Sequence, residues 1–351
     1  MGTPIEERLR TKALSYLKSH RGLRRLRTSD LFTRKMYIFP QHLKVVNYPR
    51  TPVASFNPGA ILASDKSLLI FPRLIFDYYT YTSSIGLFKI KLSDVLGRKG
   101  SLTKPIETRV ILWPKNLWEF RGCEDARVFR NGALYYILYT GYGYMPDEEY
   151  RPRIVQGLAK LDENFNVLDR GFFKILGKER EFIPKGMKDS AFIKIKRDKA
   201  LMLLRPTISN IDVCWRGEAS LSNLYIYEEH MEPVLAYEPW EFKVGWSTNV
   251  VKLSRNEYIV GWHGFLKVDF SYRNGVALID DNGELLAITD YLLVPTGIIE
   301  EYGDRPLVIF GNGLIKHKDL LLWIGGISDY AIGVFIAELD KIFENLRWVR
   351  G

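Results

Sequence analysis

A short hairpin pattern recurs along the chain, and it limits the possible folds more than any other feature of the sequence. Each copy consists of a polar or charged residue, a short apolar strand, a tight turn and a longer apolar strand. The turns are centred near residues 66, 131, 198, 256 and 318, so the period is about 60 residues. A less regular pair of strands follows each hairpin. Units of four antiparallel strands at such a period are typical of a β-propeller, in which each unit packs against its two neighbours.

The pattern therefore predicts an all-β fold, a five-bladed β-propeller that carries an N-terminal helical basic extension. The second strand pairs are expected to begin at residues 85–90, 154–161, 221–227, 275–279 and 332–339. We place the extension at residues 1–50 and the propeller, as the catalytic domain, at residues 51–351. Two packed β-sandwiches would have the same strand content, but they would not explain a fivefold period.

The positive charge of the chain lies in its first 50 residues. The 351 residues include 50 Lys or Arg and 41 Asp or Glu, which gives a formal net charge of +9. Residues 1–50 contain twelve of the basic residues and three of the acidic ones, and this difference accounts for the whole excess. We expect this part to form a helix from about Pro4 to His20, followed by a basic stretch at residues 21–27.

A basic arm of this kind can bind the phosphate groups of nucleic acids or acidic lipids. More often, such an arm packs on its own domain or on a neighbouring subunit, with its charges solvated or paired. We therefore do not expect nucleic acid as a partner. Self-association through the extension, which would give a homo-oligomer, is kept as an alternative.

Cysteine and histidine usage gives no sign of a disulfide framework or a structural metal. The chain has two cysteines, Cys123 and Cys214, and five histidines without Cys-x-x-Cys or His-Glu-x-x-His spacing. No stretch approaches 18 uncharged apolar residues, and Glu6, Glu7 and Arg8 stand where a signal peptide would be apolar. We therefore expect a cytoplasmic protein that needs neither a metal nor an organic cofactor and does not contact a membrane.

The propeller prediction places charged residues from all five hairpins at one end, near the axis. In an antiparallel hairpin, the residue before the first strand and the residue after the second lie at the same end. The resulting pairs are Asn57 with Arg73, Asp125 with Thr140, Lys188 with Arg205, Asn249 with His263, and Arg305 with Asp329. We call this expected cluster the funnel. Acids and bases gathered there are costly unless they are paired or bind something.

Asp125 is the funnel residue whose surroundings are most informative. It lies beside Glu124, between Arg121 and Arg127, directly before an apolar strand. These charges could form a structural ion-pair network that closes one blade. Alternatively, Asp125 is a general acid that protonates a leaving oxygen.

Basic and hydroxyl groups fall at matching positions of the neighbouring hairpins. They are Lys188, Arg205, His263 and, shortly after, Tyr272. Taken singly, each of them is more often structural. Together they predict a cationic, hydrogen-bonding pocket suited to phosphate or a carboxylate.

Several segments stand in a specific order along the chain. They are Phe56-Asn57-Pro58-Gly59-Ala60 with Arg73, Gly122-Cys123-Glu124-Asp125-Ala126-Arg127-Val128, Lys188-Asp189 before a hairpin ending in Arg205-Pro206, and Gly261-Trp262-His263-Gly264 with Tyr272. Pro295, Glu301, Gly303, Pro306, Phe310, Gly313 and the segment 325–329 continue the order. Over roughly residues 54–339, this arrangement resembles glycoside hydrolase family 130, the β-mannoside phosphorylases and β-1,2-mannosidases. The resemblance implies a five-bladed propeller, in agreement with the period.

The resemblance also implies a chemistry, an inverting reaction at the anomeric carbon of a β-mannoside. The aspartate matching Asp125 would be the proton donor, acting directly or through a sugar hydroxyl. Inorganic phosphate, as co-substrate, would be held by the groups matching Lys188, Arg205, His263 and Tyr272. Sugar hydroxyls would be bound by Asn57, Arg73, Glu124, Asp189 and Asp329, with Trp246 or Tyr142 offering an aromatic face.

The chain departs from the family's pattern at three places, so three functions stay open. Ala126 replaces a usual proline, Leu204 replaces a common histidine, and residues 245–250 lack Gly-x-Pro-Pro. A phosphorylase would need only to position an anionic nucleophile. An inverting β-mannosidase would need a second carboxylate to activate water, for which Glu218, Glu300 and Glu301 are candidates. The third alternative is a propeller that binds glycan without catalysis.

Overall fold

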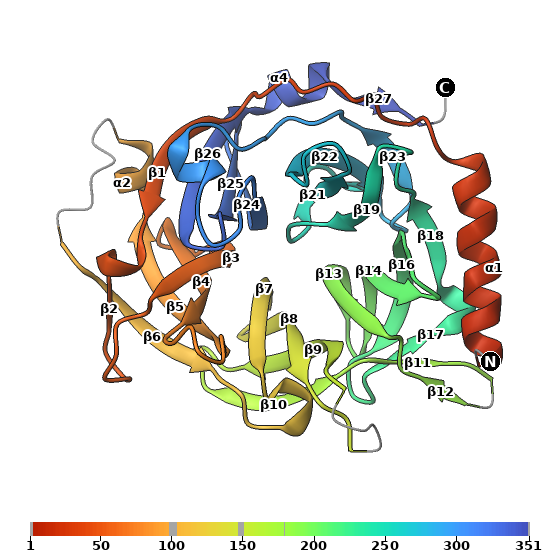
Figure 1. Ribbon diagram of the computed structural model, residues 1–351, viewed down its shortest axis with the longest axis horizontal. Coiled ribbons are helices and arrows are strands. Elements are labelled where there is room, and N and C mark those ends of the chain that lie inside the picture. Colours follow the sequence, from red (N-terminus) through yellow and green to blue (C-terminus); the bar gives the residue numbers. More distant parts are fainter. Residues whose placement is uncertain (1–2, 98–103, 147–150, 179, 350–351) are drawn as a thin grey trace.

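The computed structural model describes residues 3–97, 104–146, 151–178 and 180–349. Most of these residues lie in β-strands, which confirms the expectation of a mainly β chain. The antiparallel strand pairings form five consecutive groups, which Figure 1 shows around a central axis. Figure 1 shows β3 (Ala54–Leu62), β7 (Gly122–Asn131), β13 (Gly186–Lys196) and β24 (Ile309–His317) closest to that axis.

The first four groups follow the order of the chain from the axis outward, whereas the fifth ends with β1 from the N-terminal part of the chain. The first contains β3, β4 (Ser67–Ile75), β5 (Ser83–Lys91) and β6 (Ile106–Leu112), and the second contains β7, β8 (Leu134–Gly143), β9 (Arg153–Leu161) and β10 (Val167–Phe172). The third contains β13, β14 (Lys199–Ile208), β16 (Cys214–Ser220) and β18 (Glu232–Leu235). The fourth contains β19 (Glu241–Trp246), β20 (Val251–Lys252), β21 (Glu257–Leu266), β22 (Tyr272–Asp280), β23 (Leu285–Ile288) and β27 (Arg347–Trp348). The fifth contains β24, β25 (Leu320–Ile327), β26 (Ala331–Glu338) and β1 (Thr33–Ile38).

Short elements complete the structure. They are β2 (Leu43–Val45), β11 (Lys174–Leu176), β12 (Glu181–Phe182), β15 (Ile211–Asp212), β17 (Tyr225–Tyr227), α2 (Leu92–Leu96), α3 (Ile298–Glu301), α4 (Leu339–Glu344) and three single 3-10 turns, Pro40–His42, Leu117–Glu119 and Glu228–His230. Within the described ranges, no helix has the length and apolar character needed to cross a bilayer. In the same ranges, no group of three or more His, Cys, Asp or Glu is placed to hold a metal ion.

The five hairpin turns lie where the sequence pattern places them, but the third group differs afterwards. Its third strand was expected near residues 221–227, whereas β16 already begins at Cys214 and β17 is only three residues long. Ser209 and Asn210 both adopt left-handed backbone conformations directly after β14. Because this tight reversal sends the chain back at once, the third strand starts earlier than its apolar pattern indicated.

The N-terminal helix α1 (Pro4–Ser19) packs on its own chain. Thr3 caps it by accepting a hydrogen bond from the Glu6 amide at 3.2 Å. One apolar residue every four positions forms a buried stripe, consisting of Ile5, Leu9, Ala13 and Leu17, against the core of the third group. Arg8 and Lys12 pair with Glu228 and Glu232 on the same chain. Self-association through this helix stays a prediction.

The extension expected over residues 1–50 also supplies strands to the body. β1 pairs with β26 along the outer edge of the fifth group, and β2 pairs with β6 of the first. Figure 1 shows β1, in red, beside the blue C-terminal strands. A boundary at residue 50 would therefore cut through two groups, and the two ends of the chain meet in one sheet.

We expect Ile38→Ala to lower the free energy of unfolding by about 2–5 kcal/mol, because it removes a fully buried side chain from β1. Lys35→Ala, at an exposed position of the same strand, should change it by less than about 0.5 kcal/mol. Chemical denaturation followed by tryptophan fluorescence measures both values. Equal effects of the two substitutions would show that β1 does not close the fifth group in solution.

Candidate functional site

Three inner strands carry the same irregularity where they approach the axis. In β3, β7 and β13, the inner strand has one residue more than the neighbouring strand between two successive paired positions. The extra residue in each case is Asn57, Asp125 or Asp189, with φ of 43°, 55° and 55°. Asn and Asp enter this left-handed region more readily than other non-glycine residues. A bulge of this kind re-aims a side chain, and here it turns three polar groups toward the funnel.

The hairpin ends confirm most of the expected pairs and correct one of them. Lys188 lies opposite Arg205, and the residues before Asn57 and Asp125 lie opposite Arg73 and Thr140. The Arg305 amide donates to the Ser328 carbonyl at 3.1 Å, beside Asp329.

The expected pair of Asn249 with His263 is wrong. His263 lies opposite Gly245, because the inner strand of the fourth group begins with β19 and not at Asn249. Asn249 instead binds the backbone of Leu314 with its side chain.

Asp125 lies in a polar cluster formed by the first two groups. Only 5% of Asp125 is exposed. The Asn57 Nδ2 group donates to Asp125 Oδ1 at 3.0 Å, and Arg73 Nη1 lies 3.5 Å from the same oxygen. Arg73 also donates to Glu124 Oε1 at 2.8 Å. Burial raises the pKa of Glu124 and of Asp329, while the nearby Arg73 opposes both shifts.

The ion-pair network expected as a structural alternative forms with other partners. Glu124 pairs with Arg73 from the first group, whereas Arg121 donates to the hydroxyl of Tyr144 at 3.4 Å. Glu124 is therefore fixed across two groups, beside the carboxyl group that the sequence indicates as the acid.

Asp189 is a buried carboxylate held between two arginines. Arg127 Nη2 donates to its Oδ1 at 3.0 Å, and Arg205 Nε donates to its Oδ2 at 2.8 Å. Burial alone would raise the pKa of Asp189, but Arg205 and Arg127 outweigh burial and hold it well below its ordinary value. Arg205 also pairs with Asp212 at 3.1 Å, so its guanidinium is shared between two carboxylates.

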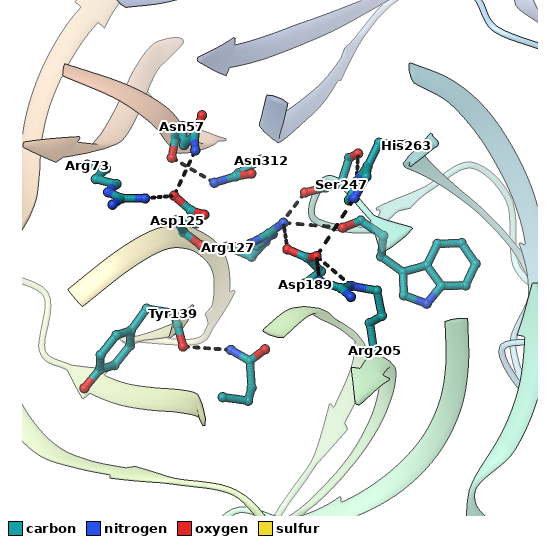
Figure 2. Close-up of polar contacts among 12 residues, drawn as sticks. Asn57, Arg73, Asp125, Arg127, Tyr139, Asp189, Arg205, Ser247, His263 and Asn312 are labelled. Atoms are coloured by element: carbon teal, nitrogen blue, oxygen red, sulfur yellow. Dashed lines mark hydrogen bonds and ion pairs between the residues drawn. The ribbon is translucent and has the colours of Figure 1, made fainter. Parts of the chain in front are cut away.

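Arg127 joins the two halves of the funnel. Figure 2 shows its guanidinium between Asp125 and Asp189. Arg127 Nη1 donates to the Asp125 carbonyl at 3.0 Å, and Nε donates to the Ser247 carbonyl at 2.9 Å. One side chain therefore ties together the second, third and fourth groups. Through its backbone carbonyl, Asp125 joins the network that includes Arg205 and His263, and the roles expected of these residues stay predictions.

His263 is a neutral member of the site and not a cation. It is 1% exposed, and its Nδ1 lies 3.0 Å from the Ser247 hydroxyl. Burial lowers the pKa of His263 well below its ordinary value. Its ring rests on Gly245, where an added Cβ would lie 2.5 Å from the ring carbon Cε1. Gly245 therefore leaves the space that the imidazole occupies.

Three cations gather around the phenol of Tyr272. Arg305 Nη2 donates to the Tyr272 hydroxyl at 3.2 Å, and Lys243 Nζ lies 5.8 Å from the centre of its ring. Burial opposes ionisation of Tyr272, yet Lys243, Arg305 and Lys188 lower its pKa below the ordinary value. Burial in turn lowers the pKa of Lys243. Among the described residues, none of the three cations has a carboxylate within ion-pair distance, 4.0 Å.

Lys188 connects this cationic cluster with the sugar-binding residues expected from the sequence. Its charge lowers the pKa of Glu124 and Asp329 on one side and of Lys243 and Tyr272 on the other. Glu124, Asp329, Lys243 and Tyr272 therefore all lie within electrostatic range of one ammonium group.

The sequence prediction missed Lys243 and the position of Arg305 in this cluster. A signal for Lys243 was present, because it precedes Gly245 by two residues and side chains two apart share one face of a strand. Arg305 was recognised only as a hairpin end. Trp246, expected as an aromatic face, is fully buried and donates to the Trp215 carbonyl at 3.3 Å. The expectation is therefore wrong for Trp246, which fills the core between two groups, and for Tyr142 it stays a prediction.

A hollow of about 490 Å³ opens at the first and fifth groups, next to Asp329. It is lined by Tyr78, Tyr81, Asp304, Arg305 and Asp329. This size is within the range of small-molecule sites. Burial raises the pKa of both tyrosines, that of Tyr78 to about 12, so they present protonated hydroxyl donors.

The three glutamates considered as hydrolytic bases have partners elsewhere. Glu218 contacts His230 at 3.3 Å, and Glu301 accepts the Gly297 amide at 3.0 Å. Glu300 is buried and accepts hydrogen bonds from Arg34 and Tyr37. These contacts give none of the three a link to Asp125.

Comparison with known proteins adds independent findings. The model of glycoside hydrolase family 130, described as beta-1,4-mannooligosaccharide phosphorylase, matches residues 22–348. A 1,2-beta-oligomannan phosphorylase of Thermoanaerobacter sp. (strain X514) is 25% identical over 229 residues, or 64% of this chain and 71% of that protein. A beta-1,2-mannobiose phosphorylase of the same organism is 27% identical over 270 residues, or 75% and 80%. The structure of beta-1,2-mannobiose phosphorylase from Listeria innocua with beta-1,2-mannobiose shares the fold, with a TM-score of 0.67, 19% identity and coverage of 88% and 96%.

The buried imidazole predicts a specific pH dependence of stability. Below its ordinary pKa of about 6.5, His263 takes up a proton in the unfolded chain but not in the folded one. Because the unfolded state binds more protons, the free energy of unfolding should fall by up to about 1.4 kcal/mol per pH unit below that value. His263→Gln should lose this component in denaturation curves between pH 7.5 and 5. His317→Gln, which changes a half-buried histidine of β24, is the control, and an equal change of slope in both variants would contradict a neutral His263.

Proposed function

Because the chain belongs to glycoside hydrolase family 130, an enzyme family that acts on β-mannosides, we propose that it is an inverting glycoside phosphorylase of a β-mannoside or a related β-linked oligosaccharide. In this proposal the five strand groups are the blades of a five-bladed β-propeller, and the funnel is its active site. The observation that carries the proposal is the set of three cations around Tyr272, which lack a carboxylate partner among the described residues. An anion of high charge would compensate them, and phosphate is the anionic nucleophile of a phosphorylase.

Asp125 is the proposed proton donor. Asn57 and Arg73 fix its carboxyl group, and its burial keeps bulk water away from the proton. In the proposed step, the bond between the anomeric carbon and the bridging oxygen breaks. The leaving sugar takes the proton of Asp125, directly or through a sugar hydroxyl. A phosphate oxygen bonds to the anomeric carbon from the opposite face, so that a β-mannoside gives an α-mannosyl phosphate.

Phosphate is proposed to bind between Lys188 and Tyr272, with Lys243 and Arg305 as additional cations. Arg205 and His263 belong to the expected phosphate set and stay in the proposal with altered roles. Arg205 is paired with Asp189 and Asp212, so its charge is largely compensated. His263 is neutral and would act as a hydrogen-bonding group.

The sugar is proposed to lie on the side of Asn57, Arg73, Glu124 and Asp329, next to the hollow beside Asp329. Asp189 was also expected to bind sugar. Both of its oxygens accept hydrogen bonds from arginines, which favours a role in holding Arg127 and Arg205 in place. Cytoplasmic location and self-association through residues 1–50 remain predictions of the sequence.

A β-mannosidase with the same funnel is the second candidate. Its water-activating base would have to be a carboxylate other than Glu218, Glu300 and Glu301, which are engaged elsewhere. Asp329 is the carboxylate to consider, because burial raises its pKa and so makes it a better proton acceptor. Phosphate dependence separates the two candidates.

We expect the wild-type enzyme to consume inorganic phosphate in step with the loss of a β-linked mannobiose, and to show little cleavage without phosphate. Asp125→Asn should lower turnover by about 10²–10⁴-fold, because the amide cannot donate the proton as an acid. Glu301→Gln, outside the funnel, should retain activity. Phosphate consumption and disaccharide loss are measured over a panel of mannobioses and mannosyl-glucose. Cleavage at equal rate in the absence of phosphate would favour the mannosidase, and full turnover by Asp125→Asn would reject the acid assignment.

Lys243→Met tests the cationic cluster. The apparent KM for phosphate should rise by about 10-fold or more, the effect of losing one hydrogen bond to a charged group, while the KM for the mannoside changes little. Lys267→Met is the matched control, since Lys267 lies on an exposed loop of the same group and binds the Pro239 carbonyl. Equal phosphate KM values for the two variants would remove Lys243 from the phosphate site.

A further inference from the structure

A buried arginine of the N-terminal extension lies directly behind the strands that carry the phosphate-site residues. The side chains of Arg24 and Glu241 are both fully buried, and Arg24 Nη2 lies 2.5 Å from Glu241 Oε2. The same nitrogen donates to the Ala236 carbonyl at 3.0 Å. The guanidinium also stacks on Trp262, 4.6 Å from the ring centre. The basic stretch thus enters the core of the fourth group.

The carboxylate of Glu241 is held from three sides. Tyr291 donates to its Oε1, while Arg24 and the amide of Glu238 bond to its Oε2. The Glu238 side chain in turn accepts the backbone amides of Gly22 and Arg24 at 2.8 and 3.0 Å. The side chain of Arg24 and the backbone of residues 22–24 are therefore both bound to residues 238–241, where β19 begins.

A bulge in β19 separates the Arg24 contact from the phosphate-site residues. The pairing of β19 with β21 shifts between Glu241 and Lys243, which leaves Phe242 as an extra residue. Without this bulge, Glu241 and Lys243 would share one face, because side chains two apart do so in a regular strand. With it, Glu241 lies on the back of the strand pair, whereas Lys243 and Gly245 lie on the front with His263.

On the back of the β19–β21 pair, Arg24 and Glu241 contact the two residues that flank His263 in the chain. Arg24 covers Trp262, which precedes His263, and Glu241 lies against Gly264, which follows it. A Cβ at Gly264 would come within 2.3 Å of Glu241 Oε1. The Arg24–Glu241 pair thus touches the two strands at the point where they carry His263 and Lys243.

We propose that Arg24 is a positioning residue for the phosphate site. It anchors the start of β19 from behind, so that Lys243 and His263 keep their places in the funnel. Loss of the Arg24 charge would leave Glu241 buried and unpaired, which is unfavourable enough to make that carboxylate move or take up water. The strand would shift with it, and a displacement of about 1 Å is enough to weaken binding at a pre-organised site. The inference rests on the proposed function, because it assumes that Lys243 and His263 face phosphate.

The Arg24–Glu241 pair is poorly suited to a purely stabilising role. Arg24 Nε and Nη1 have no hydrogen-bond partner among the described residues. A buried ion pair adds little net stability compared with well-packed apolar side chains, but breaking one is costly. A fixed geometry at the start of β19 explains why a charged pair occupies this place.

The test compares Arg24→Met with Arg25→Met, its exposed neighbour, in the full chain. Titration calorimetry with inorganic phosphate and steady-state kinetics with a mannobiose are the readouts. For Arg24→Met we expect phosphate binding weaker by about 10-fold or more, with the KM for the mannoside within about 2-fold of wild type. Arg24→Lys, which keeps the charge, should recover part of the phosphate affinity. Arg25→Met should behave as wild type.

Two results would overturn the inference. One is wild-type phosphate affinity in Arg24→Met, and the other is a parallel loss of phosphate and mannoside affinity together with thermal stability. If Arg24→Met does not fold, Glu241→Gln removes the same charge pair with little change of shape, and unchanged phosphate binding in that variant also overturns it. If the wild type binds phosphate but does not consume it in the reaction, only the proposed function is contradicted. Calorimetry of phosphate binding then still tests the positioning role of Arg24. A wild type that does not bind phosphate contradicts both.

Discussion

The site depends on the Arg127 guanidinium at the axis. Neighbouring strand groups contact each other mainly through apolar side chains, which hold them together but do not align polar atoms at the centre. Arg127 supplies that alignment, because its donors reach the Asp125 carbonyl, the Asp189 carboxylate and the Ser247 carbonyl at once. A planar guanidinium with donors in fixed directions suits such a junction, and a lysine ammonium would not replace it. The position of Asp125 is thereby coupled to that of Asp189, which lies 62 residues after Arg127 along the chain.

The funnel contains two kinds of cations, those that pair with a carboxylate and those that have no such partner in the described ranges. Arg73, Arg127 and Arg205 each pair with a carboxylate, and these pairs set the walls (Figure 2). Lys188, Lys243 and Arg305 lack such partners in the described part of the chain, and all three lower the pKa of one phenol, that of Tyr272. The first set therefore builds the pocket, and the second gives it a positive potential in a place of low dielectric constant. An anionic nucleophile gains most from that arrangement, since its charge is balanced without reorganising the walls.

The sequence predicts the fold better than it predicts which residues contact one another in the site. The fivefold hairpin period, the mainly β chain and the pairing of Lys188 with Arg205 all follow from strand patterns and hairpin geometry, which are local properties. The place of Lys243 and the partner of His263 depend on the bulge at Phe242 and on the true start of β19, and no residue type marks either of them. The neutrality of His263 depends on burial between strands far apart in sequence, which only the packed structure reveals.

Several basic residues of the first 50 positions find partners on the body of the same chain, as we expect of most such arms. An excess of nine positive charges in 50 residues looks like an arm that awaits an acidic partner, yet the partner of several of these residues is the body of the same chain. Arg8, Lys12, Arg24 and Arg34 pair with Glu228, Glu232, Glu241 and Glu300. A body with equal numbers of acids and bases has carboxylates to offer the arm only where its own bases are left over. Lys188, Lys243 and Arg305 are among the bases of the body without a carboxylate partner in the described ranges, and the positive potential near Tyr272 comes from them.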